Sequence, residues 1–322
     1  MGEPAQNVQA QNGEGSFLPT PLESILLDII LPHSLYVKVA GKYVLFRMEG
    51  DRLTEERADA LKKKNVDTVF IPADEWSKFL ATLEQYDTTQ LGGAEAESAI
   101  SRLRSLILGY GQKIDQIAEI RREELVRFQQ LASRLAQAIQ KNPKVGARIL
   151  RRYTDPSLYF VNHSVNVVIY GLVIGMKYGL SLRDLKTVAY SALMHNIGNM
   201  FMPKHILYKP GVLNQDEWEV IRTHPKKGAS LLQELQAPSE IVTVALQHHE
   251  RVDGQGYPQK LKSAEIHIFA KIIAVADVFD ALTSHRPYQG PFVPALAVQM
   301  MRYMEGKFDP QIMGMTAEAF QK

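Results

Sequence analysis

The chain has 322 residues, which is long for one domain, so two domains are expected. Its composition, with 45% hydrophobic and 22% charged residues, is that of an ordinary globular protein. The formal net charge of +2 argues against a nucleic-acid binder, which would need a strongly basic surface. Because the chain has no cysteine, disulfides, thiolate zinc sites and cysteine nucleophiles are excluded.

The N-terminal residues contain no recognisable targeting segment. Residues 1–17 are polar and lack a basic stretch followed by an apolar core, as a signal peptide would have. The longest apolar run, 167–176, is ten residues long. A membrane-spanning helix needs about 20 residues. A cytoplasmic protein without a membrane span is therefore expected.

The first 90 residues predict a flexible tail followed by a small α/β domain. Residues 1–20 are rich in Gln, Gly and Glu and have no periodicity, which is typical of a tail. In residues 21–90, β-rich segments flank Gly41-Lys42 and predict a hairpin. The expected elements are strands at 35–39, 43–47 and 68–71, a helix that opens at 53–56 and a short helix at 75–86. With His33 as its one histidine and no phosphate-binding loop, this domain is interpreted as regulatory or dimerising.

Residues 91–141 predict a linker helix. The Leu-Gly-Gly-Ala segment at 91–94 is a plausible hinge, and apolar residues then recur at helical spacing through 95–141. Two interpretations stay equally open: a coiled coil that couples a sensor to an output domain in a homodimer, or packing against the C-terminal domain. Gly109 and Gly111 interrupt imperfect heptads, so the pattern does not decide between them.

From residue 142 to residue 322 the chain predicts an all-α domain. Amphipathic helical segments follow one another there, with almost no strand pattern. The overall fold class is therefore α+β, with a small N-terminal α/β domain, a linker helix and a C-terminal helical domain. Helices are expected at 163–178, 182–194, 215–223, 227–236, 239–249, 266–283 and 294–305.

Histidines concentrate in this predicted helical domain. Five stand at the starts or ends of expected helices: His163, His195, His224, His248 and His249. Asp277 lies in an apolar helix, and a buried carboxylate there requires an ionic partner or a metal. A lone histidine at a helix end is usually a capping or surface residue, but five together with Asp277 predict a metal site. Imidazole and carboxylate ligands without thiolate suit iron, manganese or zinc. We interpret the remaining histidines of this half as structural: His205, His267 and His285.

Several short segments in this half resemble the HD-GYP domain. This domain is the branch of the HD phosphohydrolase superfamily that hydrolyses the bacterial second messenger cyclic di-GMP. The resemblance covers residues 142–305 and leaves the first 90 residues unmatched. The matching segments, in order, are His163-Ser164, MHNIGN at 194–199, PKHIL at 203–207 with KPG at 209–211, His224-Pro225, HHERVDGQGYP at 248–258, and ADVFDALTS at 276–284 followed by RPY at 286–288.

The resemblance implies a centre with two divalent metal ions. In the family, one metal is held at the positions of His163, His195 and Asp277, and the other at those of His224, His248 and His249. Iron is the first expectation, with manganese or zinc as alternatives. Two cations lower the pKa of a shared water and clamp the scissile phosphate. Tyr159 stands where some members carry a glutamate for a third metal, so a three-metal site is not expected.

Two catalytic positions depart from the family pattern. Asn196 replaces the aspartate that bridges both metals, and its amide has one carbonyl oxygen where a carboxylate has two anionic oxygens. Asn199 replaces a lysine near the substrate phosphate, a charge worth about a few kcal/mol to the transition state. A bound metal pair with low or lost turnover is therefore our preferred interpretation. A tolerant active site, a degenerate domain and a substitution introduced into the chain stay open as alternatives.

Residues near the expected centre are candidates for substrate contacts. Turn chemistry alone accounts for Asp253, Gly254 and Gly256. The resemblance adds that this loop borders the substrate pocket and contacts proteins such as GGDEF-type cyclases. Tyr257 is interpreted as a phosphate contact or a packed aromatic, and Glu250 as a partner that orients an imidazole. The candidates for phosphate or guanine contacts are Lys209, Arg286 and Tyr288, with a solvated surface charge as the alternative for Lys209.

Two functions follow from these observations. The first is a cyclic di-GMP phosphodiesterase with a binuclear metal centre of low or lost activity. The second is an inactive signalling adaptor that binds cyclic di-GMP or a protein partner. Activity on a different phosphoester is a weaker option, which the GYP segment disfavours.

Overall fold

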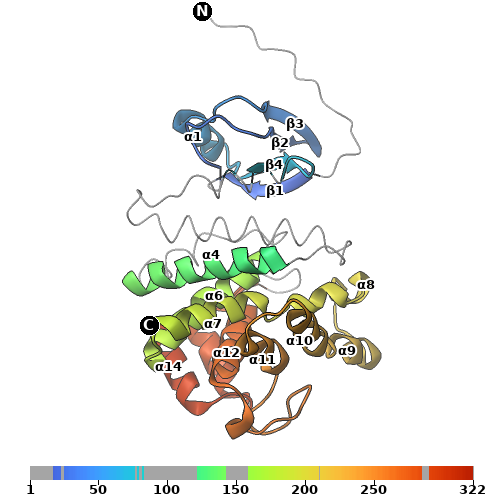
Figure 1. Cartoon of the computed structure of the whole chain (residues 1–322), viewed down its shortest axis with the longest axis vertical. Coiled ribbons are helices and arrows are strands. Elements are labelled where there is room, and N and C mark those ends of the chain that lie inside the picture. The colour runs from blue at the N-terminus through green and yellow to red at the C-terminus, as the bar shows by residue number, and fades with distance from the viewer. Residues whose placement is uncertain are drawn as a thin grey trace, which may run out of the picture. The chain divides into compact units, whose positions relative to one another are not determined.

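The computed structural model describes residues 17–22, 25–76, 78–79, 82, 122–142, 159–209, 211–284 and 290–321. The chain divides into two compact units, Met1–Asp115 and Gln116–Lys322 (Figure 1). The first contains an antiparallel sheet and the second is helical, which confirms the predicted α+β class. The predicted hinge at 91–94 and the part of the linker at 95–121 lie outside the described residues.

The first unit is built on a four-stranded antiparallel sheet in the order β1-β4-β2-β3. Strands β2 (Leu35–Val39) and β3 (Lys42–Arg47) form the predicted hairpin. Its two loop residues, Ala40 and Gly41, both have positive φ, at 47° and 81°, as the twist of a two-residue hairpin requires. The third predicted strand is β4 (Thr68–Pro72), and α1 (Glu55–Lys63) contributes Ala58 and Leu61 to the apolar core.

The prediction of a flexible tail over residues 1–20 is wrong for the last residues of that range. Residues 1–20 were expected to be flexible, but Phe17–Pro21 form β1, which pairs with β4. The segment has no alternating pattern and contains two prolines, which an edge strand tolerates because one of its sides has no ladder to complete. The Phe17 ring stacks on Tyr43 with centroids 4.3 Å apart, a tertiary contact that local sequence does not reveal.

In its described residues, the second unit contains the helices that the apolar periodicity predicted and two more, α8 and α14. Helix α10 begins at His224 rather than at 227, and α14 was not predicted because Pro310 and Gly314 dilute its apolar pattern. The short α8 was not predicted either. The described helices of the unit are α4 (Arg122–Lys141), α6 (Tyr159–Tyr178), α7 (Leu182–Met194), α8 (Lys204–Leu207), α9 (Gln215–Ile221), α10 (His224–Glu234), α11 (Ser239–Gln247), α12 (Ile268–Thr283), α13 (Pro294–Arg302) and α14 (Pro310–Phe320), with 3-10 helices η4 (Ile197–Phe201) and η5 (Ser263–Glu265).

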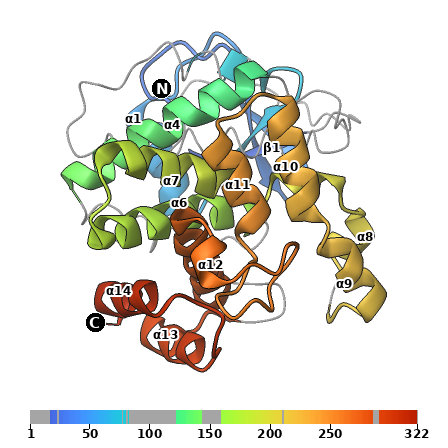
Figure 2. The same ribbon diagram turned by 60° about the horizontal axis from the view of Figure 1, so that its bottom comes forward.

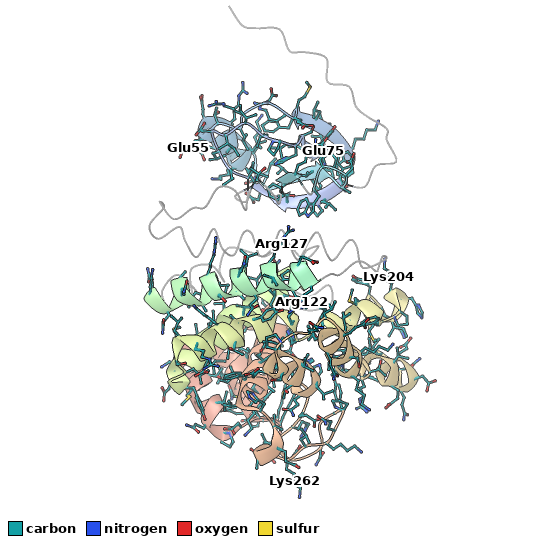
Figure 3. All side chains as sticks on the ribbon, in the orientation of Figure 1. Glu55, Glu75, Arg122, Arg127, Lys204 and Lys262 are labelled. Atoms are coloured by element: carbon teal, nitrogen blue, oxygen red, sulfur yellow. The ribbon has the colours of Figure 1, made fainter. Side chains whose placement is uncertain are left out.

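Helix α4 packs against α7 and α6 of its own unit. Its side chains Leu125, Phe128, Leu135 and Ile139 are buried. At its first residue, labelled in Figure 3, Arg122 Nη1 donates to Gln236 Oε1 at 2.7 Å. For this described part of the linker helix, the interpretation as packing against the C-terminal domain is therefore the one that the structure supports.

Helix α12 is the central element of the second unit. It contacts α6, α7, α11, α13 and α14, as Figure 2 shows. Hydrophobic side chains on several of its sides are buried, including Ile272, Val275 and Phe279. A helix buried on most of its circumference brings any polar residue it carries into the domain interior, and Asp277 and Asp280 are such residues. In the described part of the chain, no helix combines the length and hydropathy needed to cross a bilayer.

Candidate metal centre

The structure brings the six predicted ligands other than Asn196 together in two groups. Within each group the donor atoms lie within 4.8 Å of one another. The rings of His195 and His248 connect the two groups, with centroids 5.0 Å apart. The first group is His163 on α6, His195 at the end of α7 and Asp277 on α12; the second is His224 at the start of α10 with His248 and His249 after α11.

Three of the imidazoles are oriented by the carbonyl three residues earlier in the chain. His195 Nδ1 donates to Ala192 O at 2.6 Å, His224 Nδ1 to Ile221 O at 2.8 Å, and His248 Nδ1 to Ala245 O at 2.8 Å. A neutral imidazole that donates from Nδ1 has its lone pair on Nε2. These hydrogen bonds therefore select the tautomer that presents Nε2 as a metal ligand.

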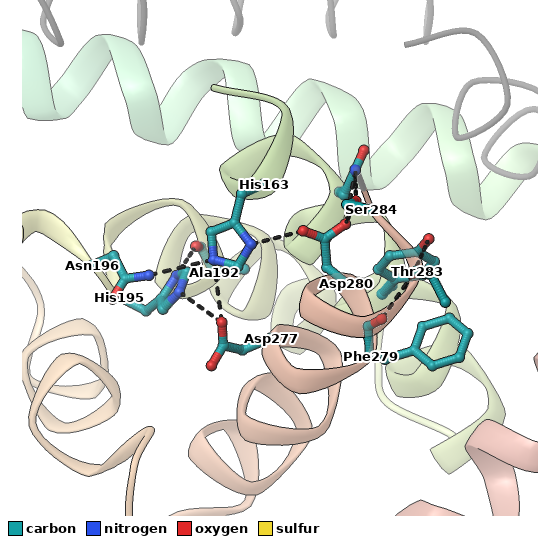
Figure 4. Close-up of polar contacts among 11 residues, drawn as sticks. His163, Ala192, His195, Asn196, Asp277, Phe279, Asp280, Thr283 and Ser284 are labelled. Atoms are coloured by element: carbon teal, nitrogen blue, oxygen red, sulfur yellow. Dashed lines mark hydrogen bonds and ion pairs between the residues drawn. The ribbon is translucent and has the colours of Figure 1, made fainter. Parts of the chain in front are cut away.

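His163 is held between two carboxylates, as Figure 4 shows. Its Nδ1 donates to Asp280 Oδ2 at 2.7 Å, and its Nε2 lies 3.2 Å from Asp277 Oδ1. Asp280 is fully buried, and its other oxygen accepts hydrogen bonds from Asn166 Nδ2 at 2.8 Å and Ser284 Oγ at 2.6 Å. Asp280 was not predicted as a site residue. A second carboxylate one turn after Asp277, in the same apolar helix, was the sequence signal for it.

The protonation states of the site suit a cation. Burial lowers the pKa of His195 to about 4 and that of His249 to about 3, so both imidazoles are neutral at pH 7. Burial also lowers the pKa of His248 well below its usual value. For Asp277, burial opposes the charged form, but the hydrogen bond with His163 and the nearby imidazoles hold its pKa well below the usual range. Neutral imidazoles and an ionised carboxylate are the forms that bind metals.

Two features indicate that a cation fits between these groups. Among the described residues, no hydrogen-bond partner reaches the buried Nε2 of His195. The Nε2 atoms of His224 and His248 face each other at 3.2 Å, although both Nδ1 protons are donated to carbonyls. Two lone pairs at that distance have no proton to share, whereas a metal ion accepts both. The donor set therefore fits divalent metal ions, as in the HD family, which is metal-dependent.

The two positions at which the sequence predicts a departure from the family pattern are Asn196, which lies beside the first group, and Asn199, which follows in η4. Asn196 follows His195, and its Nδ2 is 3.4 Å from His163 Nε2, with its amide directed toward the group in Figure 4. The Asn199 backbone N–H donates to Asn196 O at 2.9 Å, within η4. Neither residue adds a charge to the centre. Tyr159, which the sequence predicts to exclude a third metal, is the first residue of α6.

Close backbone packing positions His224 against η4, which follows His195 in the chain. A Cβ added to Gly198 would lie 2.0 Å from His224 O and 2.7 Å from the backbone N of Gly228. Gly228 in α10 meets Gly198 in turn, because a Cβ there would lie 3.0 Å from the backbone N of Gly198. These two glycines let η4 and the first turn of α10 touch through their backbones, a role that the sequence did not indicate.

The segment after His249 forms a tightly organised loop. The prediction that Glu250 orients an imidazole is wrong, because among the described residues both of its carboxylate oxygens accept hydrogen bonds from the backbone. Its buried carboxylate accepts from the backbone N–H groups of Gln259, at 2.6 Å, and Leu261, at 2.9 Å. A Cβ on Gly256 would lie 2.4 Å from the backbone N of Arg251, so only glycine fits there. Glu250 and Gly256 thus shape the loop.

The remaining loop candidates combine turn chemistry with packing. Asp253 accepts from Arg251 Nη2 at 2.6 Å and from the Gln255 N–H at 2.9 Å, and Gly254 has a φ of 79°. Tyr257 stacks on His249 with centroids 4.8 Å apart, and burial raises its pKa. The aromatic ring therefore covers one ligand of the second group.

The predicted cationic contacts are only partly described. Lys209 Nζ forms an ion pair with both oxygens of Glu217, at 2.8 and 2.6 Å, so its charge has a protein partner. Arg286, Tyr288 and His285 lie outside the described residues. Of the histidines interpreted as structural, His267 caps α12 by accepting from the Phe269 N–H, and His205 is exposed.

Comparisons with known proteins agree with this architecture. The chain is 37% identical over 185 residues to the cyclic di-GMP phosphodiesterase PA4108 of Pseudomonas aeruginosa, a match that covers 56% of this chain and 44% of that protein. It is 35% identical over 169 residues to the 3'3'-cGAMP-specific phosphodiesterase 1 of Vibrio cholerae, a match that covers 52% of this chain and 39% of that protein. The chain thus spans less than half the length of these two relatives.

A solved structure shares the fold over nearly the whole chain. Bd1817, an HDG"Y"P protein from Bdellovibrio bacteriovorus, superposes with a TM-score of 0.68 at 18% identity, covering 95% of this chain and 100% of that one. The HD domain family matches residues 121–312, which is more than half of the chain and contains both ligand groups. The predicted resemblance is confirmed, and the chain belongs to the HD domain family.

Proposed function

We propose that the chain is a metal-dependent phosphodiesterase of HD-GYP type that acts on a cyclic dinucleotide, with cyclic di-GMP as the first candidate substrate. The observation that carries the proposal is the pair of adjoining ligand groups, with the facing Nε2 atoms of His224 and His248 at 3.2 Å. The names of the relatives, which are phosphodiesterases for cyclic di-GMP or 3'3'-cGAMP, support both the reaction and the substrate class.

The residues of the centre have distinct roles in this proposal. Two bound metal ions, with iron as the first candidate, would supply a water of lowered pKa and positive charge for the phosphate. His163, His195 and Asp277 would hold one ion, and His224, His248 and His249 the other. Asp280 orients His163 through its Nδ1 proton. The exposed fraction of Asp277, 14%, leaves the first group open to a ligand from solvent.

Low turnover is part of the proposal because of Asn196 and Asn199. The Asn196 amide adjoins His163 but has no anionic oxygen with which to bridge two dications. A domain that binds the nucleotide without cleaving it, as a signalling adaptor, is the second candidate. The same two asparagines favour it.

Replacing Asn196 by Asp tests both candidates. We expect Asn196→Asp to bring the metal content to about two ions per chain and to increase cyclic di-GMP hydrolysis by at least about tenfold, since it restores a bridging carboxylate. The control is Asn142→Asp, which adds the same charge at the exposed end of α4. Metal content is measured by elemental analysis and product by chromatography.

The outcomes separate the candidates. Product from the native chain or from Asn196→Asp, with cyclic di-GMP or 3'3'-cGAMP, supports the enzyme. Tight nucleotide binding without product in either protein supports the adaptor. A fully metallated Asn196→Asp protein that neither binds nor cleaves these nucleotides contradicts both.

A further inference from the structure

Lys307 lies in the connection between α13 and α14, away from every segment in which the sequence indicated chemistry. Its carbonyl accepts from the Val252 N–H at 3.4 Å, and the carbonyl of Gly306 accepts from the Asp253 N–H at 3.0 Å. The neighbouring Glu305 carbonyl accepts from Arg251 Nη2 at 3.1 Å. The connection is therefore fastened to the loop that directly follows the ligands His248 and His249.

The close fit of these two segments depends on Gly306. Its φ is 67°, and a Cβ there would lie 2.6 Å from Asp253 Oδ2. Asp253 is itself fixed by Arg251 and by the Gln255 N–H. A glycine in the left-handed region and a held carboxylate thus set the backbone position of Lys307 relative to the metal centre.

The Lys307 side chain is half-buried and lies in the electrostatic field of both ligand groups. Burial lowers its pKa, and the charge of Asp277 in the first group opposes that shift. Its positive charge acts in turn on His249 in the second group. The aliphatic stem leads past Phe308, with Nζ 5.3 Å from the ring centroid. The backbone contacts of the connection with Arg251, Val252 and Asp253 therefore place Lys307 beside the loop that follows His249.

Lys307 differs from Lys271 and Lys209, two other half-buried lysines of the unit, in having no local counter-ion among the described residues. Lys271 Nζ pairs with Asp309 at 3.1 Å, and Lys209 Nζ pairs with Glu217. Within the described parts of the chain, no carboxylate comes within 4.0 Å of Lys307 Nζ. When metal ions occupy the centre, they take up the charge of Asp277. Lys307 then remains as a partly desolvated cation without an anionic partner among the described residues.

We propose that Lys307 is a substrate-binding residue whose ammonium group binds a phosphate of the cyclic dinucleotide at the edge of the metal centre. The inference rests on the proposed function. A cyclic dinucleotide carries two phosphodiester anions, and a metal pair that clamps one of them leaves the other in need of a positive charge. Asn199 has no charge, and the charge of Lys209 is paired with Glu217. Lys307 lies beside the loop that follows His249, and no carboxylate among the described residues pairs with its ammonium group, so we assign the second phosphate to it.

The test compares Lys307→Met, which keeps the length of the side chain, with Lys307→Arg, which keeps the charge. We expect Lys307→Met to weaken cyclic di-GMP binding to the metal-loaded full chain by about 10- to 100-fold, the value of a charge-assisted hydrogen bond. It also weakens the dependence of binding on salt, while Lys307→Arg stays within a few-fold of the native affinity. Calorimetry at two salt concentrations measures both effects, with Lys141→Met at the exposed end of α4 as the control.

The metal content and the urea unfolding of each variant are also measured, so that a loss of nucleotide binding can be distinguished from a loss of metal or of folding. Native affinity in Lys307→Met with an intact metal centre overturns the inference and leaves the proposed function standing. Loss of metal or of folding in both Lys307 variants also overturns it, because it would show a structural role. If the native metal-loaded chain binds neither cyclic di-GMP nor 3'3'-cGAMP, the proposed function fails and the inference fails with it.

Discussion

At the scale of single residues, the centre depends on hydrogen bonds that orient each imidazole. Backbone carbonyls hold His195, His224 and His248, but His163 relies on a side chain, Asp280. A carboxylate that accepts the outer N–H of a ligand histidine fixes the ring and raises its basicity. Because Asp280 also accepts from Asn166 and Ser284, it is held in place before any metal binds.

Replacing Asp280 by Asn tests this role. We expect Asp280→Asn to lower metal affinity by about 10- to 100-fold, because a neutral amide supports the His163 imidazole less well. Ser284→Ala is the control, since it removes one hydrogen bond from the same carboxylate and leaves the contact with His163 intact. Its expected cost is about 1 kcal/mol of unfolding free energy, with unchanged metal affinity. Equal metal affinities in Asp280→Asn and the native chain would show that the carboxylate is not needed.

At the scale of elements, the second ligand group is placed by helix ends that meet at glycines. His224 is the first residue of α10, and η4 touches that turn through Gly198. Because the atoms that oppose a Gly198 side chain are backbone atoms, no rotamer change relieves the contact. The position of His224 relative to His195 therefore depends on two residues that bind nothing.

We expect Gly198→Ala to destabilise the chain by about 1–3 kcal/mol and to weaken metal binding, because α10 must move away from η4. Gly314→Ala in the exposed part of α14 is the matched control, as a Cβ there meets nothing within 4 Å. A helical glycine replaced by alanine should stabilise by about 0.5–1 kcal/mol. Opposite signs in urea unfolding, with metal loss only in Gly198→Ala, would support the contact. Two variants that behave alike would contradict it.

At the scale of the whole molecule, buried neutral histidines couple stability to pH in both units. His195 and His249 in the second unit, and His33 in the first, have pKa values lowered by burial to about 4, 3 and 4. In the unfolded chain a histidine binds its proton near pH 6.5. Between pH 6.5 and about 4 the unfolded state therefore binds more protons, and the stability of the metal-free protein falls as the pH falls.

The loss of stability at low pH can be measured as a slope of unfolding free energy against pH. We expect the unfolding free energy of the metal-free chain to drop by about 1.4 kcal/mol per pH unit for each such histidine below pH 6.5. Urea unfolding between pH 7.5 and pH 5 measures it. A metal ion at a hundred times its dissociation constant should raise the unfolding free energy of the second unit by about 2.7 kcal/mol at pH 7. An unfolding free energy that stays constant over this range would show that the pKa values of these histidines are not lowered in the folded state.

By itself, the sequence determined the properties that depend on neighbouring residues. Helical periodicity placed most helices of the second unit, and the ligand types with their order along the chain were sufficient to predict the HD family. The hairpin at Ala40-Gly41 was predictable for the same reason, because turn preferences are local.

Only the tertiary structure decided which distant groups meet. It paired the edge strand β1 with β4 and placed Asp280 against His163. It also directed Glu250 to the backbone of its own loop and joined the backbone of Lys307 to the loop that follows His249. These contacts join residues far apart in the chain, or depend on backbone atoms as at Gly198, and neither kind leaves a periodic pattern. Which side chains share a site is set by how helices pack, and packing depends on all of their surfaces at once.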